Sequence, residues 1–570
     1  MSEATSRPTL ARSLLLFGLL FLVALLPRLY SAQTLGWHWD HPGSFNLVNF
    51  DEGGSCRAAL QGFDYTGFVG YQTIVVASLL GNPPPPDVAG DERAVKAYCH
   101  SPQHLLVARS YSAVTGAMTV VLTAALGLLL VPHLPAVGWT AGALLALSGF
   151  HLSESHSGTA DVPSVFFIYL FVLIVVLAVA RRSGPLLVMS PAFMLFAIWA
   201  KYWVFAALAY LACLPSRMWD YASAGLSRWQ VIALPVAAAI LFGLMSISDF
   251  RDGGYYPALA LFYLLVPWRR IRRPMILFWL LVPPAVYVMS EIDVVTRFTL
   301  SGAEGRFGSG YAAIGWHKWP RNLLNLPLLL LVALGLPALA LLPLGVRALL
   351  RGEGAVRPWC VMLPFFAFLL FMAFVSPITY YRHYLPLVPL AAILAAWGLH
   401  ASGAGARRWA VLLFLAWPAA LAWDLVSDYH HDPRIALRQW YAEHRDEHIF
   451  YSYYVNPPAG RNALFWPEYA AGDAAQLRSG HYVVLSENWY DTAYANELNG
   501  PLVHDLQRLV KTKPAYATFY RQALAGKHPL LAPVKTLSVN SFMPELLLHR
   551  YLYGNFQLFV GDIHILRIER

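Results

Sequence analysis

Two adjacent carboxylates, Asp51 and Glu52, are the residues of this chain whose type and position most suggest chemistry. They follow the first apolar stretch of a chain in which only 13% of the residues are charged. Ionisable groups near a bilayer are costly and tend to mark functional positions. A carboxylate can take the proton of an attacking hydroxyl, so the pair predicts a general base or a group that orients an acceptor. The plainer interpretation is a helix start, where acids are favoured by the helix dipole.

A second polar cluster lies in the segment HLSESHSGTADVPSVFF at 151–167. Asp161 precedes Pro163, which is typical of a capped helix start. Glu154 and His156 crowd the same short loop. His151 and His156 could ligate a metal together with Asp161, but their spacing matches no zinc pattern. We therefore predict no metal site and no certain cofactor, and a requirement for a divalent metal stays open.

Two basic residues interrupt apolar stretches further along the chain. Lys201 lies in AIWAKYWVF, and Arg382 follows Tyr381 in TYYRHYLP. Either cation could simply extend toward the membrane interface from an apolar stem. An arginine between tyrosines could equally form a two-pronged contact with a phosphate.

Composition sets the class of protein. The chain has 570 residues, of which 57% are hydrophobic, and its mean hydropathy is +0.49. Soluble proteins carry about 25% charged residues, so this is a polytopic membrane protein. The net charge of +9 does not indicate nucleic acid binding, because the arginines lie in short loops between apolar runs. These arginines instead indicate which loops lie on the cytoplasmic side of the membrane.

About 13 apolar segments could span a bilayer, the first being a retained helix rather than a cleaved signal peptide. Basic clusters follow alternate segments, which predicts a cytoplasmic N-terminus and an exported C-terminus by the positive-inside rule. The opposite loops, beginning with a long one at 32–104, hold nearly all the acids of the membrane half. The predicted spans are 13–31, 105–132, 134–151, 161–180, 185–200, 202–215, 230–248, 255–268, 275–290, 322–346, 358–376, 384–402 and 408–425.

The composition changes after the last predicted span, so we divide the chain into a membrane domain (1–425) and an exported α/β domain (426–570). Segments 448–455, 481–487 and 562–568 have the pattern of strands, and segments 432–444 and 499–510 that of helices. Two cysteines, Cys56 and Cys99, share the first long loop. An exported, oxidising compartment favours a disulfide between them, but their distance cannot be read from the sequence.

The order of these motifs resembles a known family. A first loop with DE, then SHSGTADVPSVFF, AIWAKYWV and YYRHYLPLVPLAAILAAWGL, is similar to glycosyltransferases of the C-type membrane fold. The nearest patterns are the bacterial protein-mannosyltransferase-like family and the aminoarabinose transferase that modifies lipid A. HYVVLSENWYD and GDIHILRI near the end resemble the periplasmic domain of bacterial members.

This resemblance implies a polyprenyl-phosphate sugar as donor and a lipid, glycan or protein as acceptor, at the periplasmic face of a bacterial inner membrane. It implies catalytic roles for Asp51, Glu52 and Asp161. The chain departs from the family where His41–Pro42 stands well before Phe50 and where the first loop is unusually long, which leaves the acceptor class open. The resemblance also implies a donor-phosphate site with Lys201 and Arg382, to which we add Tyr381 beside Arg382. We further expect a substrate-binding or supporting role for His156 and Arg57.

Other functions remain to be weighed. A transporter or flippase of a lipid-linked or anionic substrate predicts inverted repeats and acids at mid-membrane, whereas the acids here gather at one face. An O-antigen-type polymerase or ligase would depend on exported arginines and histidines and would lack the DE loop followed by a soluble tail. A scaffold or sensor would leave the ordered acids and bases unexplained.

Overall fold

A computed structural model was obtained for the chain. It describes residues 10–35, 49, 51–61, 67–181, 186, 193, 196, 197, 200, 201, 319–352, 365, 368, 369, 381–452, 455–458, 460–465, 474–486, 518, 519, 522–553 and 561–569. The predicted spans 202–215, 230–248, 255–268 and 275–290 and the predicted helix 499–510 lie outside these residues, and spans 185–200 and 358–376 lie largely outside them.

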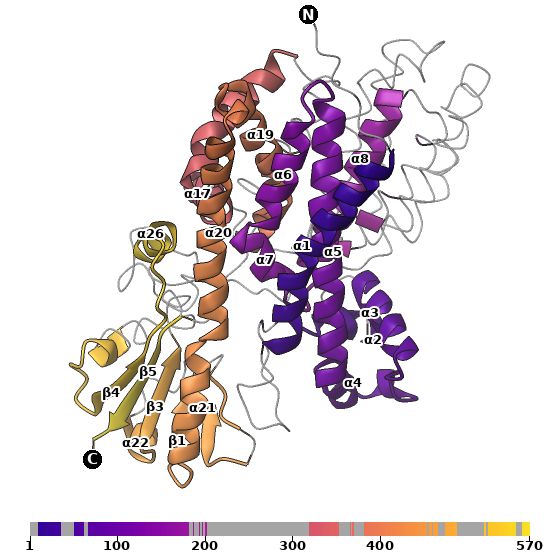
Figure 1. Ribbon diagram of the computed structural model, residues 1–570. Helices are drawn as coiled ribbons and strands as arrows, with labels where there is room; N and C mark the ends of the chain where they lie inside the picture. Colours follow the sequence, from indigo (N-terminus) through magenta and orange to yellow (C-terminus); the bar gives the residue numbers. More distant parts are fainter. Residues whose placement is uncertain are drawn as a thin grey trace, which may run out of the picture.

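The described membrane half is a bundle of apolar helices (Figure 1). Within the described ranges, six helical segments are long and apolar enough to cross a bilayer, and a bent helix pair would make a seventh. These segments confirm the predicted spans at the corresponding positions. They are α1 (Leu10–Thr34), α5 (Pro102–Leu130), α8 (Asp161–Arg181), α17 (Trp319–Leu350), the 3-10 turn η5 (Tyr381–Leu387) with α19 (Val388–Ala401), and α20 (Arg408–His430), which follows the short turn η6 (Ala404–Ala406).

The bent pair corrects the predicted single span 134–151 and the loop after it. Helix α6 (Ala136–Ala146) ends and α7 (Gly149–Ser155) begins at an angle of 59°. Arg28 of α1, completely buried, donates to the carbonyls of Leu145 (3.4 Å) and Ala146 (3.3 Å), and its guanidinium also contacts His151 Nδ1 at 3.0 Å. Carbonyls at a helix end need partners. The break is therefore stabilised by a residue distant in sequence.

Helix α17 is also broken. Gly335 has φ +80° and ψ 164°, so the predicted span 322–346 consists of two helical pieces that meet at a kink. The C-terminal piece packs closely on α19, because a Cβ on Gly345 would lie 1.8 Å from the Leu394 carbonyl oxygen and one on Gly398 would lie 2.0 Å from that of Leu341. Small residues allow membrane helices this close approach.

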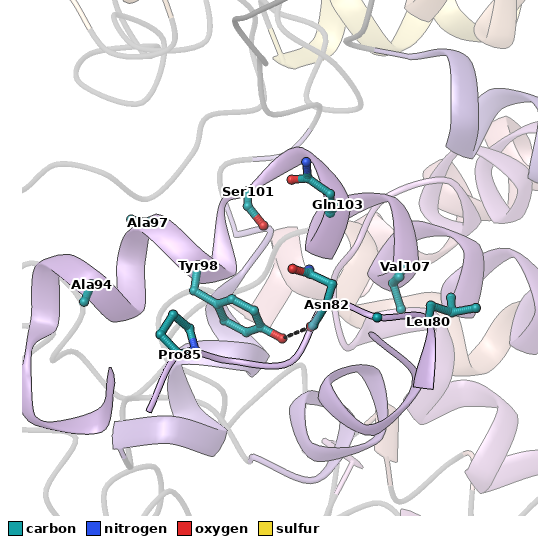
Figure 2. Close-up of a pocket in the computed structure, with 10 residues that line it drawn as sticks. Leu80, Asn82, Pro85, Ala94, Ala97, Tyr98, Ser101, Gln103 and Val107 are labelled. Atoms are coloured by element: carbon teal, nitrogen blue, oxygen red, sulfur yellow. Dashed lines mark hydrogen bonds between the residues drawn. The ribbon is translucent and has the colours of Figure 1, made fainter. Parts of the chain in front are cut away.

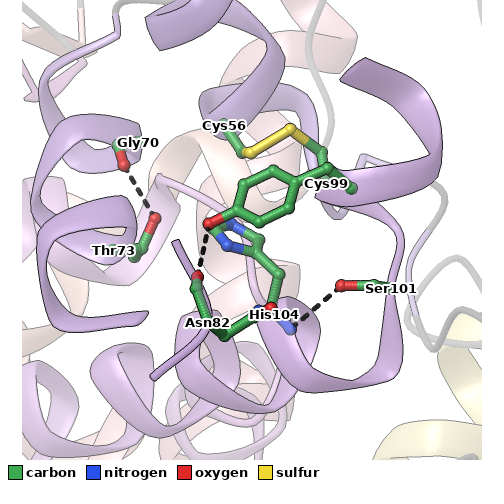
Figure 3. Close-up of a disulfide and its surroundings, with 8 residues drawn as sticks. Cys56, Gly70, Thr73, Asn82, Cys99, Ser101 and His104 are labelled. Atoms are coloured by element: carbon green, nitrogen blue, oxygen red, sulfur yellow. Dashed lines mark hydrogen bonds between the residues drawn. A yellow bond between two sulfur atoms is a disulfide. The ribbon is translucent and has the colours of Figure 1, made fainter. Parts of the chain in front are cut away.

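The first long loop folds into short helices beside the lower end of α5 (Figure 1). These are α2 (Gly54–Gln61), α3 (Phe68–Leu79), the turn η1 (Val88–Gly90) and α4 (Glu92–Cys99). A disulfide joins Cys56 of α2 to Cys99 of α4, with the two Cα atoms 5.7 Å apart (Figure 3). The pairing that the sequence left open is thus formed, and it closes the loop immediately after the Asp51–Glu52 pair.

The described residues of the C-terminal part form a mixed parallel and antiparallel sheet of five strands, in the order β2-β1-β3-β5-β4. The strands predicted at 448–455, 481–487 and 562–568 are confirmed as β1 (Ile449–Tyr451), β3 (Tyr482–Ser486) and β5 (Ile563–Ile568), and the helix at 432–444 as α21 (Pro433–Glu443). Strand β4 carries Pro533 at the sheet edge, where a missing N–H is tolerated. The elements without a sequence prediction are β2 (Ala463–Phe465), α22 (Ala474–Arg478), β4 (Leu531–Leu537) and α26 (Pro544–Tyr553).

The membrane half and the sheet are connected by α20, which continues to His430, beyond the predicted span end at 425. Asp432 caps α21 by accepting from the Arg434 N–H, and Pro433 occupies the first turn. His430 lies beside the end of α1, its Nε2 atom 3.3 Å from Ser31 Oγ. We call this side of the bundle, which carries both the sheet and the first-loop helices, the domain face (Figure 1).

Candidate active site

Asp51 lies in the turn just before α2 and forms an ion pair with Arg382 of η5. The two residues are 331 positions apart, and the fold brings them together at the domain face. Their side chains are 18% and 14% exposed, so both are shielded but reachable by a molecule that enters the site. A carboxylate held by one guanidinium is accessible to a second partner, such as an acceptor hydroxyl.

Asp161 starts α8 and forms a second ion pair. Lys201 Nζ donates to Asp161 Oδ1 at 2.8 Å, and the two side chains are 20% and 1% exposed. Arg382 and His383 of η5 also lie within electrostatic range of Asp161. The two ion pairs therefore belong to one cluster, in which Lys201 and Arg382 are both more exposed than the buried Asp161.

Glu154 of α7 is the third carboxylate of this cluster. Its electrostatic neighbours are Asp51, Asp161, Lys201 and Arg382. It is buried, and its Oε2 atom has no hydrogen-bond partner among the described residues. The sequence placed this residue in the second polar loop without giving it a role. The structure adds it to the cluster as a buried carboxyl group with one oxygen that accepts no hydrogen bond from the described residues.

Glu52 has a different environment from its neighbour Asp51. Its two oxygens accept from Arg109 Nε at 2.7 Å and Nη2 at 2.8 Å, and both side chains are completely buried. The backbone N–H of Gly158 donates to Glu52 Oε1 at 2.8 Å, and Arg109 Nη1 donates to the Leu35 carbonyl at 2.6 Å. Glu52 thus joins the first loop, α5 and the 156–160 loop rather than facing an opening.

Arg109 is a site residue that the sequence interpretation missed. It lies inside the predicted span 105–132, and an arginine within a span is itself a signal for a buried partner. The geometry is a two-pronged carboxylate–guanidinium contact, which is strong and directional. The Glu52–Arg109 contact fixes the position of the Asp51–Glu52 turn relative to α5.

The turn is held from the other side by His100, which follows α4. A Cβ on Gly53 would lie 2.4 Å from His100 Cδ2, and Gly53 has φ +80°, a conformation that favours glycine. The His100 ring also lies close enough to the Glu52 backbone to interact with it. Burial, followed by the charges of Lys96 and Arg57, lowers the pKa of His100.

The remaining predicted residues lie at varied distances from the cluster. His156 is completely buried with its ring 4.7 Å from that of Tyr429, and neither ring nitrogen has a hydrogen-bond partner among the described residues. Arg57 pairs with Glu92 at 3.3 Å, which links α2 to α4. Tyr381 begins η5, next to Arg382.

A cavity of about 710 Å³ lies between the first-loop helices and the start of α5. Its wall includes Tyr98, whose hydroxyl donates to the Asn82 carbonyl at 3.0 Å (Figure 2). The polar part of its lining also includes Ser101 and Gln103 at the start of α5, and the apolar part includes Leu80 after α3. It contains none of the charged residues described above. Within the described part of the chain, no group of three or more His, Cys, Asp or Glu side chains is arranged to hold a metal ion.

These features define a polytopic helical membrane protein whose C-terminal part contains helices and a mixed parallel and antiparallel sheet. Its structure is similar to the oligosaccharyltransferase of Archaeoglobus fulgidus in complex with Zn and sulfate, with TM-score 0.45 and 13% identity over 87% of this chain and 70% of that one. The oligosaccharyltransferase AglB of the same organism, with an inhibitory peptide and a dolichol-phosphate, gives TM-score 0.45 and 11% identity over 97% and 88% of the two chains. No family model and no curated protein sequence matches the chain.

Proposed function

We propose that the protein is an integral-membrane glycosyltransferase that moves a sugar from a polyprenyl-phosphate carrier to a lipid, glycan or protein acceptor at the domain face. The observation that carries this proposal is the cluster of two ion pairs, Asp51–Arg382 and Asp161–Lys201. It provides a proton acceptor and two cations at one site, which are the groups that this reaction needs.

The chemistry follows from the bonds that change. The acceptor oxygen forms a bond to the anomeric carbon while the bond from that carbon to the carrier phosphate breaks. The phosphate leaves with additional negative charge, so positive groups positioned at its oxygens stabilise the transition state. Arg382 and Lys201 fit this role, and an arginine can contact two phosphate oxygens at once.

The acceptor hydroxyl must lose its proton as it attacks, and Asp51 is the acid placed to take it. Its side chain is 18% exposed, whereas that of Asp161 is 1% exposed. We infer that a bound donor phosphate competes with Asp51 for Arg382 and thereby releases the Asp51 carboxylate to act as base. Asp161 then keeps Lys201 in place, and Glu52 positions the turn through Arg109.

A flippase for the same lipid-linked substrate is the second candidate, and the helix breaks favour it. Discontinuous spans are common around transporter binding sites. Both breaks described here are occupied by side chains, Arg28 at the α6–α7 break and Glu545 at Gly335, which favours fixed elements over moving ones.

Reconstitution in liposomes with a polyprenyl-phosphate sugar labelled in the sugar distinguishes the two candidates. A transferase moves the label onto an acceptor and leaves an unglycosylated carrier phosphate. A flippase changes the leaflet of the intact donor and forms no new product. Movement of intact donor, with no transfer to any lipid, glycan or protein fraction, would overturn the proposal.

A further inference from the structure

The chain after β4 leaves the sheet and packs among the membrane helices. Leu537, the last residue of β4, belongs to the core of the sheet together with Ile563. Val539, Met543 and Leu546, which follow it, belong instead to the core formed by the membrane helices. The boundary between the two cores is therefore crossed within two residues, and α26 lies on the membrane side of it.

Two buried carboxylates of α20 bind the segment that leads into α26. Asp428 Oδ2 accepts from the Ser541 hydroxyl at 2.5 Å. Asp424 Oδ2 accepts from the backbone N–H groups of Phe542 at 2.9 Å and Met543 at 2.6 Å. Backbone that is not yet helical can lie at membrane depth only when protein groups satisfy it. Carboxylates are costly within a membrane span. The hydrogen bonds to residues 541–543 offset this cost for both aspartates.

Glu545 marks how deep the segment reaches. Its Oε1 atom accepts from Trp417 Nε1 at 2.5 Å and from the backbone N–H of Leu336 at 3.3 Å. At 1.5 Å per residue, Trp417 lies about 14 Å along α20 from Arg408 and roughly 20 Å from His430. The hydrocarbon core is about 30 Å thick. A bilayer that covers α20 from Arg408 to His430 therefore places Glu545 near its middle. Leu336 follows the Gly335 break, and Glu545 satisfies one of the backbone groups freed there.

The other face of this segment is apolar, and no described part of the chain covers it. Phe542, Leu547 and Leu548 are 57%, 46% and 41% exposed. Figure 1 shows α26 beside α20 at the level of α7, well separated from the strands of the sheet. At this depth the surroundings of an uncovered side chain are acyl chains rather than water.

We propose that residues 541–553 form a re-entrant segment, which enters the bilayer from the domain face and places Phe542, Leu547 and Leu548 against lipid acyl chains. The C-terminal domain is then anchored in the hydrocarbon and not only tethered through α20. The inference concerns membrane insertion and is independent of the proposed glycosyl transfer.

Spin labelling of the full-length protein in liposomes tests this proposal. The two cysteines outside the disulfide are first replaced (Cys213→Ser and Cys360→Ser), and a nitroxide is then attached at Leu547→Cys. The matched control carries the nitroxide at Lys535→Cys, on the exposed part of β4. We expect the label at 547 to collide more often with oxygen than with a water-soluble nickel chelate, and the label at 535 to show the reverse ratio. Nickel access at 547 equal to that at 535, or low access to both reagents, would contradict lipid contact.

A second measurement uses the unmodified protein, in case the labelled variants do not assemble. Phospholipids with a photoreactive group on the acyl chain are incorporated into the liposomes, and the cross-linked peptides are identified by mass spectrometry. We expect adducts on the peptide that contains 542–548 and none on the peptide that contains β3. Absence of adducts from 542–548, when α1 is labelled, would overturn the proposal.

Discussion

Adjacent carboxylates can have separate roles when their partners differ, as Asp51 and Glu52 do. Asp51 meets a cation in a partly open site, whereas Glu52 is buried against Arg109 with its oxygens bonded on several sides. Removing one partner of a buried pair leaves an uncompensated charge, which is more damaging than losing the pair as a whole.

We therefore predict that Glu52→Gln destabilises the protein and that Asp51→Asn does not. The expected loss for Glu52→Gln is about 3–5 kcal/mol, because the Arg109 guanidinium stays buried without its counter-charge. Thermal unfolding of the two purified variants in the same detergent measures this. Equal melting temperatures for both variants and the parent would show that the Arg109 contact is not needed for stability.

Gly53 gives a second prediction at this scale. Gly53→Ala should lower both stability and activity, because a left-handed alanine costs roughly 1–2 kcal/mol and its Cβ would also meet His100. Gly81→Ala is the control, since Gly81 also has positive φ (+87°) but no atom within 4 Å of the added Cβ. If both variants lose the same amount in thermal unfolding and transfer assays, the His100 contact has no separate effect.

At the scale of elements, the first-loop helices act as a frame for the acidic turn. The disulfide joins α2, which begins directly after the turn, to α4, which ends next to His100 (Figure 3). Tyr98 and Asn82 add a hydrogen bond between α4 and the end of α3. A shift of α4 would therefore move both sides of the acidic turn.

We predict that Cys56→Ser lowers the melting temperature and slows transfer. The disulfide closes a loop with a sequence separation of 43, for which the chain-entropy model gives about 4 kcal/mol of stabilisation. Treating the parent protein with a thiol reductant should have the same effect, and treating the variant should add nothing. Full activity of the reduced parent would show that the other contacts position the turn unaided.

The elements also show what a sequence can and cannot reveal. Uninterrupted apolar runs predicted the described spans, because composition alone decides whether a helix can lie in lipid. The breaks after Ala146 and at Gly335 were not predicted, because Arg28 and Glu545 stabilise them from remote parts of the chain. Helix α26 was missed for the same reason, since its partners lie on α17 and α20.

The candidate site was predicted in part. The residue types of Asp51, Asp161, Lys201 and Arg382 identified them as candidates, because charges are rare in an apolar chain. Which cation pairs with which acid depends on contacts over as many as 331 positions, and no local pattern carries that information. Their catalytic and donor-binding roles stay predictions until variants are assayed.

At the scale of the whole molecule, the start of α1 and the C-terminal sheet lie at opposite faces of the bundle (Figure 1). Ser31 near the end of α1 meets His430 near the sheet, so the start of α1 lies at the other face. Together with the basic loops, this gives a cytoplasmic N-terminus and an exported C-terminal domain as the proposed orientation.

A reporter fused after Arg570 that functions only in an exported compartment should therefore be active, and the same reporter fused before Met1 should be inactive. Reversed activities would invert the orientation and place the proposed site in the cytoplasm. The cysteine pair would then lie in a reducing compartment, which disfavours a disulfide.

The most direct test of the central claim compares the parent with Asp51→Asn in liposomes, measuring donor binding and single-turnover transfer separately. If Asp51 is the base and competes with the donor phosphate for Arg382, the variant binds the polyprenyl-phosphate sugar at least as tightly as the parent. Its transfer rate falls by about 10²–10⁴, the contribution of a positioned base. Near-normal transfer by a correctly folded Asp51→Asn variant would contradict this account.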